Sequence, residues 1–139
     1  MNLLTATITT AVTAVVGTTF LAQDGGVRSI AIQGNFTYGS SGTTAVVYVQ
    51  TSFDGGATWC DAANFAFTTS SLRKVFNLSA STPITTIATP TDGSLTSNTC
   101  VDGMVGPLWR TKLTTTGTYA TSTTIAVDAY FDGSLVQVA

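Results

Sequence analysis

Hydrophobic and polar residues alternate along the first sixteen positions of the chain. Apolar residues occupy most even positions from Leu4 to Val16, and threonines occupy most odd positions from Thr5 to Thr13. A period of two is typical of a β-strand, because successive side chains of a strand point to opposite faces. The β-branched residues disfavour a helix, where they lose side-chain freedom. The pattern therefore predicts a strand over residues 3–16.

The same period recurs in two pairs of segments, each joined by turn residues rich in Gly, Ser or Thr. The first pair carries Ile30, Ile32, Phe36 and Tyr38 before "GSSG" at 39–42, and Val47, Val49 and Phe53 after it. The second pair carries Trp109 and Leu113 before "GTYATS", and Ile125, Val127, Ala129 and Phe131 after it. A turn between two alternating segments is typical of a β-hairpin. We therefore expect hairpins over residues 27–53 and 107–131.

The middle of the chain adds two strand candidates and one irregular segment. The candidates are "TWCDAANFAF" and "LRKVFNLS", and the irregular segment runs from Ser79 to about Gly106, with prolines in and beside it. Proline lacks the N–H that a central strand donates. No segment keeps a helical period. The sequence predicts one all-β domain over residues 1–139, an antiparallel β-sandwich or jelly roll of about eight short strands, with a flattened barrel as the alternative.

Composition limits the function classes. Hydrophobic residues make up 44% of the 139 residues, enough for a core, but charged residues only 9%, against about 25% in an average soluble protein. A surface with so few charges is better tolerated in a permanent assembly than in a free monomer. The net charge of −2 and the scattered basic residues argue against nucleic acid as a partner. Threonines interrupt the apolar N-terminus, and this argues against a membrane span.

The residue inventory argues against an enzyme. The chain contains no histidine and no glutamate, so the usual general base and the commonest transition-metal ligand are missing. Most of the seven aspartates stand beside glycine, where an aspartate caps its own turn. Calcium between loops is the alternative, but no aspartate spacing matches a known calcium loop. We expect no catalytic residue, no cofactor and no metal.

The segment "SFDGGATW" at 52–59 is a complete short motif. Its pattern consists of Ser52, Asp54, Gly56, Thr58 and Trp59, and it resembles the Asp-box of sialidases and related propellers. The resemblance implies a hairpin turn in which the aspartate accepts backbone hydrogen bonds, the glycine adopts a conformation costly for other residues, and the tryptophan packs underneath. A sialidase also needs several such repeats, an arginine cluster and a Tyr/Glu pair. This chain has one copy and no glutamate, so the motif predicts a structural turn.

The two cysteines leave two alternatives open. Cys60 follows the Asp-box directly, and Cys100 opens "CVDGMVG" after the irregular segment. A disulfide between them would hold that segment against the sheet. Free cysteines that act as small buried hydrophobes are the alternative, because the N-terminus lacks an export signal.

Two further sequence segments carry a resemblance that covers most of the chain. "TSFDGGATW" and "WRTKLTTTGTY" stand within residues 27–131, a stretch that resembles small accessory virion proteins of tailed bacteriophages. The resemblance implies a structural role in a capsid or connector lattice, and we interpret the chain as a capsid decoration or cement protein. The acidic balance argues for a position away from packaged DNA, on the outer capsid surface, and the N-terminal segment for synthesis in the host cytoplasm. Its partners would be the major capsid or connector protein and copies of itself. A neck or tail-tube structural protein is the alternative location.

Two further expectations concern binding surfaces. A carbohydrate-binding β-sandwich module is the competing class, with an aromatic platform drawn from Trp59, Trp109, Tyr38, Tyr48, Tyr119 and Tyr130. Residue parity places Trp109 in the core and weakens this hypothesis. The terminal segments 1–16 and 132–139 either pair with a neighbouring subunit, as an assembly arm and a tail, or close the domain's own sheets.

Overall fold

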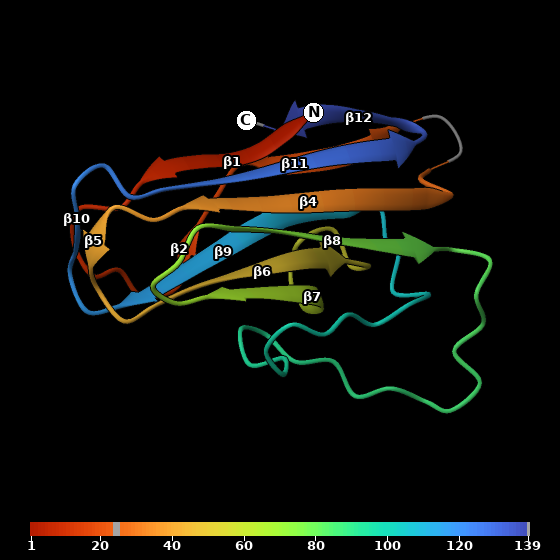
Figure 1. The fold of residues 1–139 in the computed structure, drawn as a ribbon. Coiled ribbons are helices and arrows are strands. Elements are labelled where there is room, and N and C mark those ends of the chain that lie inside the picture. The colour runs from red at the N-terminus through yellow and green to blue at the C-terminus, as the bar shows by residue number, and fades with distance from the viewer. Residues whose placement is uncertain (24–25, 139) are drawn as a thin grey trace.

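The computed structural model describes residues 1–23 and 26–138, which form two antiparallel sheets packed face to face (Figure 1). The strands are β1 (Asn2–Thr7), β2 (Val15–Val16), β3 (Thr19–Gln23), β4 (Ser29–Thr37), β5 (Ser40–Ser41), β6 (Thr44–Ser52), β7 (Cys60–Phe67), β8 (Leu72–Ser79), β9 (Leu108–Thr116), β10 (Tyr119–Ala120), β11 (Thr124–Asp132) and β12 (Ser134–Val138). The described residues contain no helix, and hence none long enough to span a membrane. The predicted all-β antiparallel sandwich is confirmed.

Each sheet combines strands from distant parts of the chain. Sheet 1 has the order β1-β11-β4-β8. Sheet 2 has the order β12-β3-β9-β6-β7, and β2 also pairs with β9. The short strands β5 and β10 pair with each other at one end of the sandwich (Figure 1). Nine of the described strands have five residues or more, which agrees with the expected number of about eight.

The core lies between the sheets and follows the predicted parity. In β4 the residues Ile30, Ile32 and Phe36 are buried, and their neighbours in sequence are less buried or exposed. The same alternation holds in β9 from Trp109, in β11, and in β6 as far as Val49, after which Gln50, Thr51 and Ser52 are all buried. Phe53 is an exception: it is 57% exposed because β6 ends at Ser52 and Phe53 lies in the following turn.

The two predicted hairpins are wrong. β4 lies in sheet 1 and β6 in sheet 2, and likewise β9 lies in sheet 2 and β11 in sheet 1. Alternation specifies which face of a strand is buried, but either sheet of a sandwich satisfies it. The turn residues at 39–42 and 117–122 therefore connect the two sheets. The hairpin that is present joins β6 to β7 through the Asp-box.

The N-terminal strand is shorter than predicted. β1 ends at Thr7, and Ala14 adopts a positive φ of 51°, so residues 8–14 do not continue the strand. A register irregularity between Asn2 and Leu4 shifts the buried face to Leu3.

Both terminal segments pair within the chain. β1 pairs with β11 and β12 pairs with β3. In the structure, therefore, the terminal segments close the domain's own sheets, which was one of the two alternatives that the sequence left open. The apolar side chains explain this arrangement, because Leu3 and Ile8 are buried in the core and would be exposed on a free arm.

The irregular segment contains no strand, as predicted, and it runs along β7 (Figure 1). Backbone N–H groups of Asp61 and Asn64 donate to carbonyls of Thr91 and Thr99, at 2.8 and 2.9 Å. The segment therefore covers the outer edge of sheet 2, which would otherwise expose unpaired backbone groups.

Candidate functional site

The Asp-box residues form the turn between β6 and β7. The Asp54 carboxylate accepts hydrogen bonds from the Thr58 backbone N–H at 2.8 Å, the Thr58 hydroxyl at 2.5 Å and the Ser52 hydroxyl at 2.9 Å. The hydrogen bonds from Thr58 and Ser52 lower the pKa of Asp54 from 3.8 to about 2. Gly56 has a φ of 91°, a value that side chains disfavour. Its carbonyl accepts from the Trp59 indole at 3.1 Å, so all five motif residues lie in one turn.

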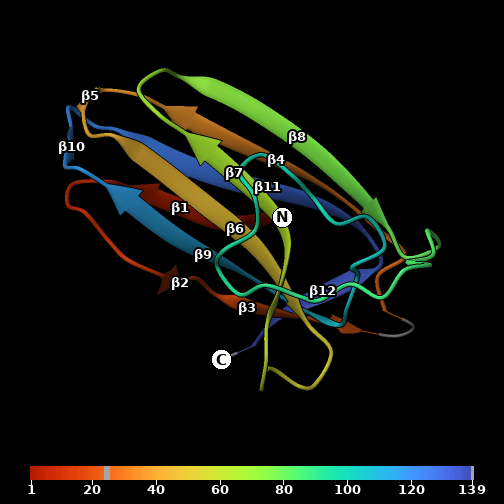
Figure 2. The same ribbon diagram turned by 90° about the horizontal axis from the view of Figure 1, so that it is seen from below.

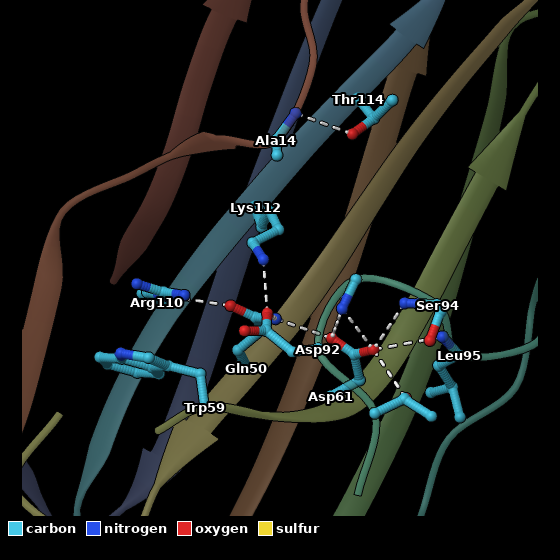
Figure 3. Close-up of polar contacts among 12 residues, drawn as sticks. Ala14, Gln50, Trp59, Asp61, Asp92, Ser94, Leu95, Arg110, Lys112 and Thr114 are labelled. Carbon is cyan, nitrogen blue, oxygen red and sulfur yellow. Dashed lines mark hydrogen bonds and ion pairs between the residues drawn. The ribbon is translucent and has the colours of Figure 1, made fainter. Parts of the chain in front are cut away.

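A buried glutamine organises the outer face of sheet 2 beside this turn (Figure 3). Gln50 is fully buried, and its amide nitrogen donates to Asp61 at 2.8 Å and to Asp92 at 2.7 Å. Its amide oxygen accepts from Nε of Arg110 at 2.8 Å. Lys112 pairs with Asp92, and this contact and the bond from Gln50 lower the pKa of Asp92. One neutral side chain thus links two acids to an arginine.

Asp61 anchors the irregular segment to β7. Its carboxylate accepts from the backbone N–H groups of Gly93, Ser94 and Leu95 at 2.8 to 3.2 Å, and from the Thr91 hydroxyl at 2.8 Å. Asp61 is buried, and a buried carboxylate is tolerated only when such donors replace water. The charge of Asp61 is therefore satisfied inside the protein.

Arg110 stacks on Trp59. The guanidinium carbon lies 4.1 Å from the centroid of the indole ring, a distance typical of a cation–π contact. Burial lowers the pKa of Arg110, but an arginine stays charged because its ordinary pKa is so high. The stack fixes both planar groups at the end of the Asp-box turn (Figure 3).

An open groove of about 800 Å³ begins at this stack. The Asp-box turn forms one wall with Gly55, Gly56 and Trp59, and Arg110 and Leu108 of β9 lie beside it. The opposite wall comes from residues before and in β3 and from the end of β12, namely Gly17, Thr18, Thr19, Leu21, Gln137 and Val138. Figure 2 shows the β6–β7 turn and the C-terminal strand at the same end of the sandwich.

The six aromatic residues considered for a sugar platform do not form one. Trp109 and Tyr119 are buried in the core, and Tyr130 lies in sheet 1, away from the groove in sheet 2. Trp59 is half-buried and lines the groove. The continuous aromatic platform is therefore absent among the described residues, and Trp59 alone of the six lines the groove.

The two thiols are free. Cys60 is buried at the start of β7, and Cys100 is exposed and bridges Ala63 through its backbone. Cys60 and Ala63 are separated by three residues of strand, or about 10 Å, so Cys100 lies too far along β7 for a bond to Cys60. The proposed link between the irregular segment and β7 is supplied instead by Asp61 and Asn64.

The outer face of sheet 1 is a second candidate binding surface, besides the groove on sheet 2. Val75 of β8 and Tyr130 of β11 are 69% and 76% exposed and line a shallow hollow with Ala31 and Met1. Asp128 also lines this hollow, and Arg73 lies two positions before Val75 on the same face of β8. Within the described residues no group of three or more metal-ligating side chains occurs.

The Asp-box is recognisable in the sequence, but the cluster beside it is not. Gln50 follows directly on a run of apolar residues in β6, and a polar residue that is buried beside such a run needs hydrogen-bond partners. Asp61 differs from most of the other aspartates because no glycine follows it. Neither signal predicts the hydrogen-bond partners, which lie 11 to 60 residues apart in the sequence.

No family model matches the chain, and no curated protein matches it. A solved structure titled "CBM4 structure and function" is similar over 88% of this chain and 61% of that chain, with a TM-score of 0.38 and 10% identity. This chain therefore spans less than two thirds of that structure. A likeness at this level does not indicate a function.

Proposed function

We propose that this chain is a structural, non-catalytic protein of a phage particle, and that it decorates the outer surface of the capsid. One observation carries the proposal: the outer face of sheet 1 exposes two large side chains, Val75 and Tyr130, around a shallow hollow that also contains Asp128. An exposed apolar patch on a small domain is typical of an interaction site.

The distribution of charge supports an assembled protein. Arg28 pairs with Asp132 at 3.2 Å, and Lys112 pairs with Asp92. Arg110 stacks on Trp59, and Lys74 donates to the carbonyl of Ala66. Two of the five basic side chains thus pair with an acid within the chain, and the chain as a whole has few charges to keep copies apart. A location on the outer surface agrees with the net charge of −2, which disfavours contact with packaged DNA.

The test is incorporation of surface variants into particles. Cells that produce the particles would carry tagged wild-type protein, Val75→Lys or the control Val16→Lys, which adds the same charge at an exposed position of sheet 2. Purified particles would be probed for the tag. We expect wild type and Val16→Lys in the particles, and at least a tenfold loss for Val75→Lys with unchanged solubility. Absence of the wild-type protein from purified particles would exclude the proposal.

The neck or tail-tube alternative is decided by the same particles. Labelling the tag for electron microscopy would place the protein over the whole head if it is a decoration protein. Label restricted to the neck or the tail would retain the structural role but move it to the alternative location.

A further inference from the structure

We propose that the groove beside the Asp-box is a binding site for a carboxylated saccharide, held through the guanidinium of Arg110. This inference goes beyond the structural role and does not depend on it. The groove volume of about 800 Å³ lies within the range of small-molecule sites, about 300 to 1,000 Å³.

The charge of Arg110 selects a ligand with a carboxylate. Arg110 is the one charged side chain among the described residues that line the groove. The acids nearest to it are already satisfied, Asp92 by Lys112 and Asp61 by backbone N–H groups. The Arg110 Nε is occupied by Gln50. The terminal nitrogens remain for a ligand, and a guanidinium binds a carboxylate through two parallel hydrogen bonds.

The position of Arg110 is fixed before any ligand arrives. Gln50 holds the guanidinium from one side and the Trp59 ring holds it from another. Gln50 is itself fully buried and bonded to Asp61 and Asp92. A preorganised arginine loses little side-chain entropy on binding.

The remaining lining suits a sugar ring. Thr18, Thr19 and Gln137 offer hydroxyl and amide groups on the wall opposite the Asp-box. Leu21 and Val138 are exposed apolar side chains on the same wall and match the C–H faces of a saccharide. Polar groups for orientation beside apolar contact area are typical of ligand sites.

The test uses two trisaccharides that differ only at C6, where one carries carboxylates and the other neutral hydroxymethyl groups. Trigalacturonate carries a carboxylate on each ring, and α-1,4-linked galactotriose is the neutral counterpart. Isothermal titration calorimetry would measure both against the full chain. We expect trigalacturonate to bind at least tenfold more tightly, and in ¹H–¹⁵N spectra to shift the signals of Gly55, Gly56, the Trp59 indole and Thr19.

Variants locate the site. Arg110→Gln should weaken trigalacturonate binding at least tenfold, and Arg73→Gln, which removes one arginine from sheet 1, should leave it unchanged. If Arg110→Gln does not fold, the spectral map of the wild-type chain decides. Absence of binding, equal binding of the neutral trisaccharide, shifts that lie away from the groove, or equal loss in Arg73→Gln would each overturn the proposal.

Discussion

At the scale of single residues, three side chains determine the outer face of sheet 2, and each acts through hydrogen bonds at its own position. Asp54 closes the Asp-box turn, Asp61 anchors the irregular segment, and Gln50 connects that anchor to Arg110. Each therefore has a separate, measurable consequence.

The Asp54 carboxylate makes the turn sensitive to acid. Its folded-state pKa of about 2 lies below the ordinary value of 3.8, so the ionised form is favoured by folding. The stabilisation is complete above about pH 4 and is lost as the pH falls toward 2. We expect Asp54→Asn to lower the melting temperature by several degrees at pH 7 and by less at pH 2.

Thr58 provides the matched control, because Thr58→Ser keeps the hydroxyl that donates to Asp54 and Thr58→Val removes it. Thermal melts at both pH values would compare the pair. The proposed role of Asp54 fails if Thr58→Val and Asp54→Asn both melt like the wild type at pH 7.

Asp61 supports the irregular segment through several donors at once. We expect Asp61→Ala to destabilise the fold by about 2 to 4 kcal/mol, because buried N–H groups lose their acceptor. Denaturant unfolding would measure the loss, and hydrogen exchange should speed up at residues 93–95. Unchanged exchange at these residues would show that the segment is held by other contacts.

At the scale of elements, the two sheets fit closely where β4 passes β7. A Cβ on Gly34 would lie 3.0 to 3.3 Å from atoms of the Phe65 ring, closer than ordinary contact. We expect Gly34→Ala to cost about 1 to 3 kcal/mol, measured by denaturant unfolding, because the ring has to move in a packed core. The control is Ala31→Gly, which changes an exposed position on the outer face of the same strand. If the Gly34→Ala protein is as stable as the wild type, the Phe65 ring can move without a loss of stability, and this prediction is wrong.

β1 is an edge strand of sheet 1 and contributes side chains to the core. Deletion of residues 1–8 removes Leu3 and Ile8 from the core and exposes the edge of β11. We expect the truncated chain to be insoluble or unfolded by circular dichroism. A truncated protein that stays soluble and β-rich would restore the interpretation of this segment as a separate arm.

The sequence predicted the elements better than their pairing. Strand parity located Ile30, Val47 and Ile125 in the core, because burial of one face leaves a direct mark on the sequence. The pattern does not show which sheet a strand joins. For this reason the sequence predicts a hairpin of β4 and β6, although they lie in different sheets. Arg110 is one of several scattered basic residues in the sequence, and its contacts with Gln50 and Trp59 could not be predicted because they depend on long-range pairing.

At the scale of the whole molecule, the two broad faces of the sandwich differ. Sheet 1 presents an open surface around Val75 and Tyr130, and sheet 2 carries the irregular segment, the buried network and the groove. If the protein is assembled through sheet 1, the groove on sheet 2 stays accessible. The structural role and the saccharide site are therefore compatible in one molecule.

Above all, we propose that this chain lies on the outer surface of a phage capsid. Cryo-electron microscopy of purified particles tests it most directly, because a map at side-chain resolution identifies both the protein and the face it buries. We predict a β-sandwich on the outside of the head, with Val75 and Tyr130 against the shell or a neighbouring copy. The proposed location and contact face would be contradicted if the particles contain the protein with these side chains facing solvent, or if they lack the protein altogether.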